Sequence, residues 1–280
     1  MPRLPLTVDD HSRDSAGLRY VYPVLSRRAN GVSVGINLNP NNACNWRCIY
    51  CQVPDLVRGG PPPLDLGLLE RELAGFLDQV TRGDFSWQGA AAGRRLVDVA
   101  FSGNGEPTSA REFPAAVAVV CRLLEQRQLA RTVPVRLITN GSLLDRRAVQ
   151  AGIADIGRAD GEVWFKVDAA TAAGLARING TRSDPDRVAR RLETCAGLAR
   201  TWVQTCVFRH DGNQPATAEC HAYIELLRPL ARRLAGVHLY GLARPSMQPE
   251  AQRLSRLDSE WLEGFARRLR GLGFEVRVSP

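Results

Sequence analysis

The sequence predicts an α/β protein whose strands form a partial or near-complete parallel (β/α) barrel of about six strand–helix units. Short runs rich in β-branched residues alternate along the chain with segments of helical periodicity. Polar turns separate the two kinds of segment. The chain has 280 residues, enough for one large α/β domain. Such alternation predicts βαβ units, whose right-handed crossovers place every strand-to-helix loop on one face.

Seven short apolar segments are predicted strands, and six segments between them repeat apolar residues at helical spacing. The strands are 32–39, 97–103, 135–141, 162–169, 201–208, 237–243 and 274–279. The helices are 64–80, 112–128, 144–153, 184–200, 216–234 and 257–272. Asp65, Asp184 and Asp258 stand at the starts of three helices, where an aspartate accepts hydrogen bonds from free backbone amides.

The domain organisation follows from these elements. Residues 1–31 precede the first strand and are predicted to form an irregular N-terminal extension, and residues 32–280 form the barrel domain. No stretch of 18 or more apolar residues is present, so no membrane-spanning segment is expected. The first 20 residues contain no apolar core followed by a small-residue cleavage site, so we expect a cytoplasmic protein.

The positive charge of the chain is carried almost entirely by arginine. The formal net charge is +8, and Lys166 is the only lysine among 37 basic residues. A basic balance is compatible with nucleic acid or acidic protein partners, although arginines spread over many helices are typical of solvated faces. A lysine kept where arginine serves elsewhere suggests that this position needs an amine.

Three cysteines are concentrated in the stretch NACNWRCIYCQ, residues 42–52. Cys44, Cys48 and Cys51 directly follow the first predicted strand, on the face that carries the chemistry in (β/α) barrels. Structural zinc sites close with four ligands, and no fourth cysteine or histidine is near. Three thiolates instead hold three corners of an iron–sulfur cluster and leave one iron open for a ligand. The other four cysteines are far apart, and Cys121 and Cys195 in helical patterns are expected to be buried apolar residues.

Polar motifs follow the next strands. FSGNGEPT (101–108) contains Asn104, Gly105 and Glu106, in which the glycine permits close backbone approach and the glutamate can accept from an ammonium. ITNGSLL (138–144) contains Asn140 in an Asn-Gly turn. Lys166 and Asp168 are two residues apart, so we expect them on the same face of a strand, either as an active-site pair or as a salt bridge at the rim.

The last strands add further candidates. Gln204 shares a strand face with Cys206, and the following loop holds His210, Asp211 and Asn213, which we interpret as contacts to substrate or ribose or as an ordinary polar loop. HLYGLARPS (238–246) contains Tyr240 in the strand and Arg244 at its end, where a carboxylate or phosphate could bind.

The C-x3-C-x2-C spacing with an aromatic residue before the last cysteine resembles the cluster-binding motif of the radical S-adenosylmethionine (SAM) superfamily. The resemblance implies a [4Fe-4S] cluster on Cys44, Cys48 and Cys51 and a barrel of the radical SAM type. Residues 104–106 resemble the family's glycine-rich motif, which holds the methionine amino group. The Asn140 turn and the Tyr240 strand resemble its later motifs, of which the latter holds adenine.

The motifs taken together resemble the wyosine-base-synthase-like branch of this superfamily. The resemblance implies an enzyme that cleaves SAM reductively to a 5′-deoxyadenosyl radical, which abstracts hydrogen from either a tRNA or a small metabolite. Lys166 and Asp168 are the predicted catalytic pair, with Asp168, Gln204 and Tyr240 also predicted to contact the cofactor. Because no flavin motif or second cluster is visible, we expect a flavodoxin or ferredoxin as electron donor.

Two other classes of protein remain open on the sequence alone. A non-catalytic iron–sulfur electron carrier or sensor would explain the cysteines without the polar motifs at later strand ends. A zinc-stabilised, basic RNA-binding module would explain the charge, but it requires a fourth metal ligand.

Overall fold

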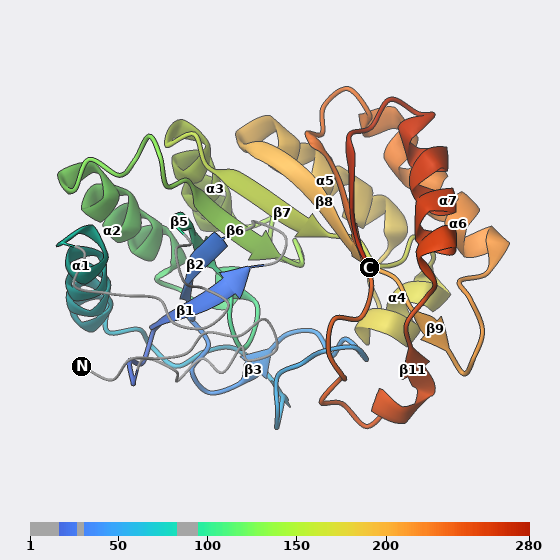
Figure 1. The fold of residues 1–280 in the computed structure, drawn as a ribbon, viewed down its shortest axis with the longest axis horizontal. Helices are drawn as coiled ribbons and strands as arrows, with labels where there is room; N and C mark the ends of the chain where they lie inside the picture. Colours follow the sequence, from blue (N-terminus) through green and yellow to red (C-terminus); the bar gives the residue numbers. More distant parts are fainter. Residues whose placement is uncertain (1–16, 27–30, 83–94) are drawn as a thin grey trace.

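The computed structural model describes residues 17–26, 31–82 and 95–280. It is built on one large curved sheet with helices on its outer side (Figure 1), accompanied by two small two-stranded sheets. The sheet contains, in spatial order, β1 (Val21–Ser26), β2 (Gly31–Ile36), β5 (Leu96–Phe101), β6 (Val135–Thr139), β7 (Glu162–Lys166), β8 (Arg200–Cys206), β10 (Gly236–Tyr240) and β12 (Val276–Ser279). β1 is antiparallel to β2, and the other neighbouring pairs are parallel. Within the described residues β1 and β12 are the free edges. The predicted α/β class and partial parallel barrel are therefore confirmed.

The six predicted helices are present, and a short seventh was not predicted. They are α1 (Leu66–Arg82), α2 (Phe113–Gln126), α3 (Arg147–Arg158), α4 (Ala172–Asn179), α5 (Pro185–Leu198), α6 (Thr217–Leu227) and α7 (Ser259–Arg270). Asp65, Asp184 and Asp258 accept backbone hydrogen bonds at 2.8, 3.2 and 2.7 Å, which confirms all three N-caps. The unpredicted helix α4 has only eight residues and ends at Gly180 in the left-handed conformation (φ 61°).

The segment before the first predicted strand differs from the expectation. Residues Val21–Ser26 form β1 instead of an irregular extension, and Pro23 pairs with Val34 of β2. The strand was not predicted because it contains Pro23. Proline has no backbone N–H and occurs in a sheet only on edge strands or at bulges. β1 is an edge strand. Residues 1–16 of the predicted extension lie outside the described residues, and the division at residue 31 stays a prediction.

The two faces of the sheet have different chemistry. On β5, Val99 and Phe101 are fully buried on the outer side, where Phe101 meets Phe113 of α2 with ring centroids 5.8 Å apart. Their neighbours Asp98 and Ala100 point to the concave side and line a cavity there. This alternation with period two places the core under the helices and leaves a polar hollow inside the half-barrel.

Candidate active site

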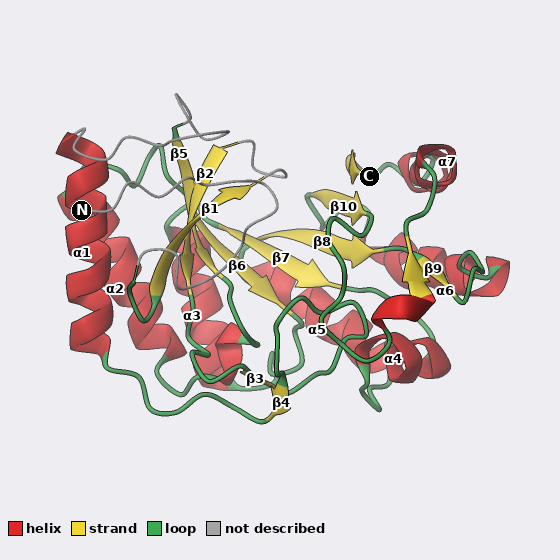
Figure 2. Cartoon of the chain, turned by 60° about the horizontal axis from the view of Figure 1, so that its bottom comes forward, coloured by secondary structure: helices red, strands yellow, loops and turns green. Residues whose placement is uncertain are grey.

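The three cysteines lie in the long loop between β2 and α1, which Figure 2 shows at the lower edge of the molecule with β3 and β4. Cys44 belongs to β3 (Ala43–Cys44), which pairs in parallel with β4 (Val57–Arg58). Cys48 and Cys51 lie in the turn between these two short strands. We call residues 42–58 the cysteine loop. Its three cysteine residues are partly exposed and form no disulfide.

The end of α4 holds the cysteine loop from one side. The backbone amides of Arg47 and Ile49 donate to the carbonyls of Asn179 and Ile178, at 3.1 and 2.9 Å. The Asn179 side chain is fully buried, and its Nδ2 lies 3.3 Å from the Sγ of Cys48. Sequence reasoning did not single out Asn179, because a lone asparagine before a glycine is an ordinary helix-end signal.

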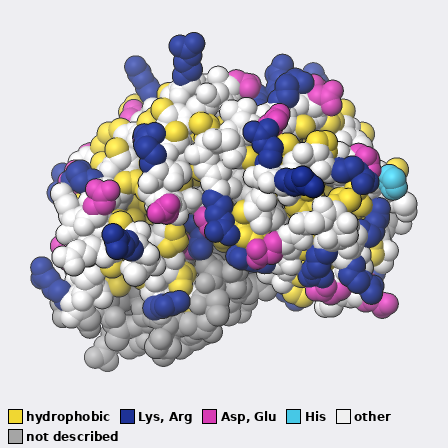
Figure 3. Space-filling model, turned by 90° about the horizontal axis from the view of Figure 1, so that it is seen from above, with side chains coloured by type: hydrophobic (Ala, Val, Ile, Leu, Met, Phe, Trp, Pro, Cys, Tyr) yellow, Lys and Arg dark blue, Asp and Glu magenta, His cyan; other side chains and the backbone are white. Residues whose placement is uncertain are grey.

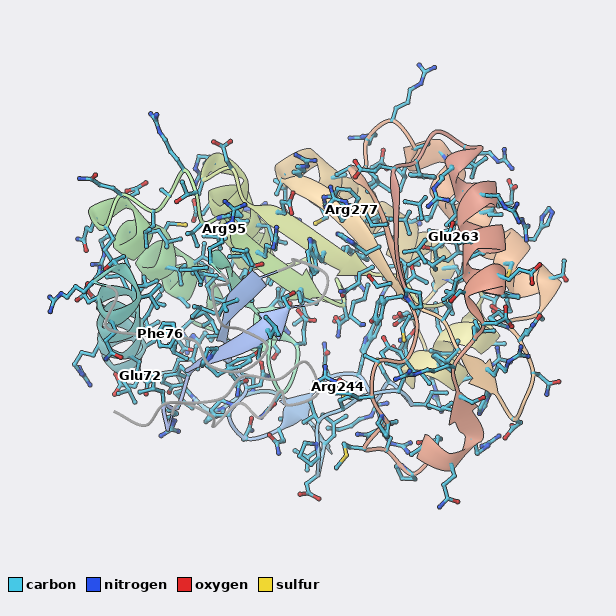
Figure 4. The ribbon with its side chains drawn as sticks, in the orientation of Figure 1. Glu72, Phe76, Arg95, Arg244, Glu263 and Arg277 are labelled. Atoms are coloured by element: carbon cyan, nitrogen blue, oxygen red, sulfur yellow. The ribbon has the colours of Figure 1, made fainter. Side chains whose placement is uncertain are left out.

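The segment after β10 holds the loop from another side. Ser246 Oγ donates to the carbonyl of Ile49 at 2.7 Å, and the Met247 amide donates to the carbonyl of Cys51 at 2.9 Å. Arg244, labelled in Figure 4, belongs to this segment, and its backbone carbonyl accepts from Gln52 Nε2 at 3.4 Å. Contacts from two distant parts of the chain therefore fix the backbone between the cysteines.

A cavity of about 310 Å³ opens on the concave side of the sheet next to this loop. Its lining includes, from the predicted site, Cys44, Cys48, Cys51, Asn104, Gly105, Glu106, Asn140, Lys166, Gln204 and Tyr240. These residues come from the carboxyl ends of β2, β5, β6, β7, β8 and β10. The structure therefore brings together every predicted site residue except Asp168, whose side chain lies behind the cavity wall.

The three cysteines line the cavity from a single loop. Among the described residues, no group of three His, Cys, Asp or Glu side chains is arranged to hold a single metal ion. Burial raises the pKa of Cys44 to about 11 and that of Cys48 to about 12. A bound iron would supply the positive charge that favours the thiolate form of these cysteines.

The Glu106 carboxylate is already engaged by the protein. Its Oε1 accepts from the Thr108 and Thr139 hydroxyls, both at 2.6 Å, and its Oε2 accepts from the Asn140 amide at 2.7 Å. Burial raises the pKa of Glu106 against these hydrogen bonds, which favour the charged form. Glu106 therefore ties the end of β5 to the end of β6, a bracing contact that the sequence did not reveal.

Asn104 and Gly105 contact the cysteine loop directly. Asn104 Nδ2 donates to Asn42 Oδ1 at 2.6 Å, whereas its buried Oδ1 has no hydrogen-bond partner among the described residues. A Cβ on Gly105 would lie 2.0 Å from the carbonyl oxygen of Ala43. Glycine is thus needed where the two loops touch, and Asn104 presents an open acceptor beside the cavity.

The side chain of Asn140 is likewise used within the protein. Its Nδ2 donates to Asn45 Oδ1 at 2.9 Å, and its Oδ1 accepts from the Ser142 amide at 3.0 Å. Asn45 lies between the first two cysteines, so the Asn-Gly turn after β6 positions the cysteine loop as well as lining the cavity.

Lys166 is a fixed cation at the cavity wall. Its Nζ donates to the Tyr240 hydroxyl at 3.2 Å and lies 3.9 Å from Asp168 Oδ2 and 4.9 Å from the ring centroid of Tyr50. Burial alone favours the neutral amine, but the charge of Asp168, followed by Tyr240, leaves the pKa of Lys166 above its ordinary value. The amine therefore stays protonated, as a cation and not as a neutral base.

Asp168 forms the predicted pair with Lys166, at 3.9 Å, but it does not line the first cavity. β7 ends at Lys166, and the carboxylate two residues later is buried away from the cavity. Its Oδ2 accepts from the Tyr50 hydroxyl at 2.5 Å and from Asn179 Nδ2 at 2.8 Å, and its Oδ1 accepts from the Cys206 amide at 3.0 Å. Asp168 is thus a positioning residue that links the cysteine loop, α4 and β8.

The residues predicted on β8 and its loop divide between two cavities. Gln204 lines the first cavity, and its buried Nε2 has no hydrogen-bond partner among the described residues. His210, Asp211 and Asn213 line a second cavity of about 400 Å³ with Tyr223 and other side chains of α6 and α7. The loop after β8 therefore turns away from the cysteines, which a motif in a sequence cannot show.

The deep end of the first cavity contains charged residues that the sequence did not single out. Arg136 pairs with Asp98 and, through Nε at 3.3 Å, with Glu162, and its guanidinium lies 5.1 Å from the ring of Trp164. Asp98 and Arg136 lie three residues before the last residue of their strands, and Glu162 is the first residue of β7, so no strand-end motif marked them in the sequence.

The half-barrel, the three-thiol loop and the convergent polar lining define an enzyme that combines a metal cluster with a small-molecule cofactor. The model of the radical SAM superfamily matches residues 38–217. This span holds all three cysteines and most of the cavity lining. The chain belongs to the radical SAM superfamily, whose members use a [4Fe-4S] cluster and SAM.

Solved structures with the same fold include a radical SAM methyltransferase from Sphaerobacter thermophilus. It superimposes with a TM-score of 0.61 at 17% identity, over 92% of this chain and 68% of that chain. anSMEcpe with bound AdoMet gives a TM-score of 0.49 at 17% identity, over 76% of this chain and 52% of that chain. OxsB, a cobalamin-dependent S-adenosylmethionine radical enzyme, gives a TM-score of 0.48 at 11% identity, over 86% of this chain and 30% of that chain.

One curated protein matches in sequence. It is named GTPase Obg, from Brachyspira hyodysenteriae, and is 27% identical over 134 residues. The match spans 47% of this chain but 17% of that protein. No helix among the described residues is long and apolar enough to cross a membrane.

Proposed function

We propose that Cys44, Cys48 and Cys51 hold the [4Fe-4S] cluster and that SAM binds in the adjoining cavity. The chemistry that the pair supplies is reductive cleavage of SAM to a 5′-deoxyadenosyl radical, which takes a hydrogen atom from a substrate. The observation that supports this most strongly is that one cavity is lined by the three thiols and by polar side chains from successive strand ends. The cavity offers the cation of Lys166, the free acceptor Asn104 Oδ1 and the free donor Gln204 Nε2, and this combination suits a zwitterionic ligand.

The polar atoms of the cavity suggest how the ligand is oriented. The open Oδ1 of Asn104 is an acceptor for the methionine ammonium. The protonated Nζ of Lys166 is a donor for the methionine carboxylate or for a carboxylate of the substrate. We assign Gln204 Nε2 and the Tyr240 side chain, which line the same cavity, to the ribose and adenine. Glu106 and Asp168 brace the loops that carry these groups.

The finer assignments are also part of the proposal. We assign the chain to the wyosine-base-synthase-like branch, with either a tRNA or a small metabolite as substrate and a cytoplasmic location. On the face shown in Figure 3, the basic side chains of the described residues are dispersed among acidic ones, which is typical of a solvated face. A flavodoxin or ferredoxin supplies the electron.

Anaerobic reconstitution separates this function from an electron carrier. The reconstituted protein should contain about four irons per chain. It should convert SAM to 5′-deoxyadenosine when reduced by dithionite. Replacing all three cysteines by alanine should abolish both properties, whereas Cys121→Ala on α2 is the matched control and should retain them. A protein that binds the cluster but leaves SAM intact would be a carrier or sensor.

A further inference from the structure

Two large apolar side chains are exposed within the described part of the chain, and both belong to the surroundings of the cysteine loop. Val57 is 52% exposed and Met247 is 57% exposed. The chain buries its other large apolar side chains within that part at least partly. An exposed apolar pair at one functional site, reached from distant parts of the sequence, points to a contact with another molecule.

Both residues are held against the backbone that carries the proposed cluster ligands. Val57 pairs with Ala43 in the β3–β4 ladder, and its amide donates to the carbonyl of Asn42 at 3.0 Å. The Met247 amide donates to the carbonyl of Cys51 at 2.9 Å. The backbone of each apolar residue is therefore hydrogen-bonded directly to the cysteine loop.

The charge next to these side chains is mostly positive. Arg58 follows Val57 and donates to the carbonyls of Asn45 and Gly180, with no carboxylate partner among the described residues. Arg182, two residues after Gly180, is exposed and likewise has no ion pair within the described ranges. Of the nearby acids, Glu250 pairs with Arg47 at 2.8 Å and Asp184 lies 4.0 Å from Arg190. Asp55 is the exposed acid of the cysteine loop, and Arg58 and Arg182 together outweigh it.

We propose that Val57, Arg58, Arg182 and Met247 form the docking surface for the protein that reduces the cluster. We call these four residues the donor face. The partner is an acidic, small electron carrier with apolar residues around its redox centre. One electron passes from its reduced flavin or iron–sulfur centre to the cluster, so the carrier is oxidised by one electron and no bond is made or broken.

The composition of the donor face fits a short-lived complex. Electron-transfer partners meet over small interfaces, typically below about 1,200 Å², and separate after each electron. An apolar centre provides the contact, and charges at the rim speed the encounter and orient the partners. Docking beside the cysteine loop is also where a donor approaches the cluster most closely. The inference rests on the proposed function, because it requires a cluster on these cysteines.

The test compares a protein donor with a small-molecule reductant. Met247→Asp and Arg182→Glu are suitable variants, since neither side chain holds the cysteine loop. The control is Arg232→Glu, the same charge change in the turn before β10, at the opposite end of the strands. Holoenzyme is mixed with a reduced flavodoxin, and in parallel with a reduced ferredoxin, in stopped-flow experiments at low salt. Affinity for the oxidised carrier is measured by calorimetry.

We expect both variants to lower the second-order rate of cluster reduction and to weaken carrier binding about tenfold, the lower end of electrostatic steering effects. The loss for Arg182→Glu should shrink as salt is added. Reduction by dithionite and SAM cleavage with dithionite should match the wild type. The proposal of the donor face is contradicted if the two variants behave like Arg232→Glu, or if neither carrier reduces the wild-type cluster. Failure with dithionite would instead refute the proposed function.

Discussion

Asn179 illustrates how one buried amide affects the proposed cluster. Its Nδ2 is shared between Cys48 Sγ at 3.3 Å and Asp168 Oδ2 at 2.8 Å. A hydrogen bond to a ligating sulfur stabilises the more negative, reduced cluster and raises its reduction potential. Asn179→Leu should lower the midpoint potential by roughly 20–60 mV, the equivalent of about 0.5–1.5 kcal/mol for one electron.

An EPR-monitored redox titration measures this change, with iron content checked on the same sample. Asn179→Ala also removes the N–H donor, without adding a carboxyl beside Asp168, and should lower the potential in the same direction. A potential equal to that of the wild type, with full iron content, would show that the amide only supports the loop.

Lys166 supplies the second prediction at the scale of the residue. Lys166→Met removes the cation near the cavity wall and should weaken SAM binding about ten- to a hundredfold, the equivalent of a charged hydrogen bond. Calorimetry on the holoenzyme measures it. Full SAM affinity combined with lost turnover of the substrate would move the role of Lys166 from cofactor to substrate.

The pH dependence of this contribution has a definite sign. The pKa of Lys166 lies above its ordinary value, so the amine is charged below that value and loses its proton only at still higher pH. SAM affinity of the wild type should therefore change little between about pH 7 and 9 through Lys166. An affinity that falls with an apparent pKa within this range, and does not do so in Lys166→Met, would contradict the assignment.

At the scale of the element, the turn after β5 and the cysteine loop depend on one another. Gly105→Ala places a Cβ against the Ala43 carbonyl and should destabilise the protein by about 1–3 kcal/mol and reduce cluster occupancy. Gly75→Ala in α1 is the matched control, because nothing lies within 4 Å of its added Cβ. Gly75→Ala should raise the free energy of unfolding by about 0.5–1 kcal/mol, because glycine within a helix is destabilising. Denaturant unfolding and iron analysis compare the two, and equal effects would refute the close approach.

The sequence predicted strongly periodic elements well and irregular ones poorly. The seven strands and six helices carry their own period, so their order could be predicted. The ends were less accurate: the helix predicted over 216–234 ends at Leu227, and the one predicted over 144–153 continues to Arg158. β1 was missed because Pro23 is acceptable only at an edge, and the edge is a property of the assembled sheet. α4 was missed because eight residues offer little periodicity.

At the scale of the whole molecule, the half-barrel explains which parts of the site were predictable. Parallel strands bring their carboxyl ends to one edge, so residues after each strand were expected to meet, and they line one cavity. The direction of a side chain after the strand has ended is set by tertiary contacts. The Asp168 carboxylate therefore lies behind the wall of the first cavity, where it accepts from Tyr50, and His210 lines the second cavity. Glu106 and Asn140 were predicted to bind the cofactor, and the structure also engages them in bracing contacts.

The central claim is that the cluster on the cysteine loop has an open iron facing the SAM cavity. EPR of the dithionite-reduced wild type before and after addition of SAM carrying a ¹⁵N-labelled amino group tests it most directly. The account predicts a changed cluster signal and a ¹⁵N coupling by electron–nuclear double resonance, both lost when Cys48 is replaced by alanine. A reduced cluster whose spectrum is unchanged by saturating SAM, with no ¹⁵N coupling, would contradict it.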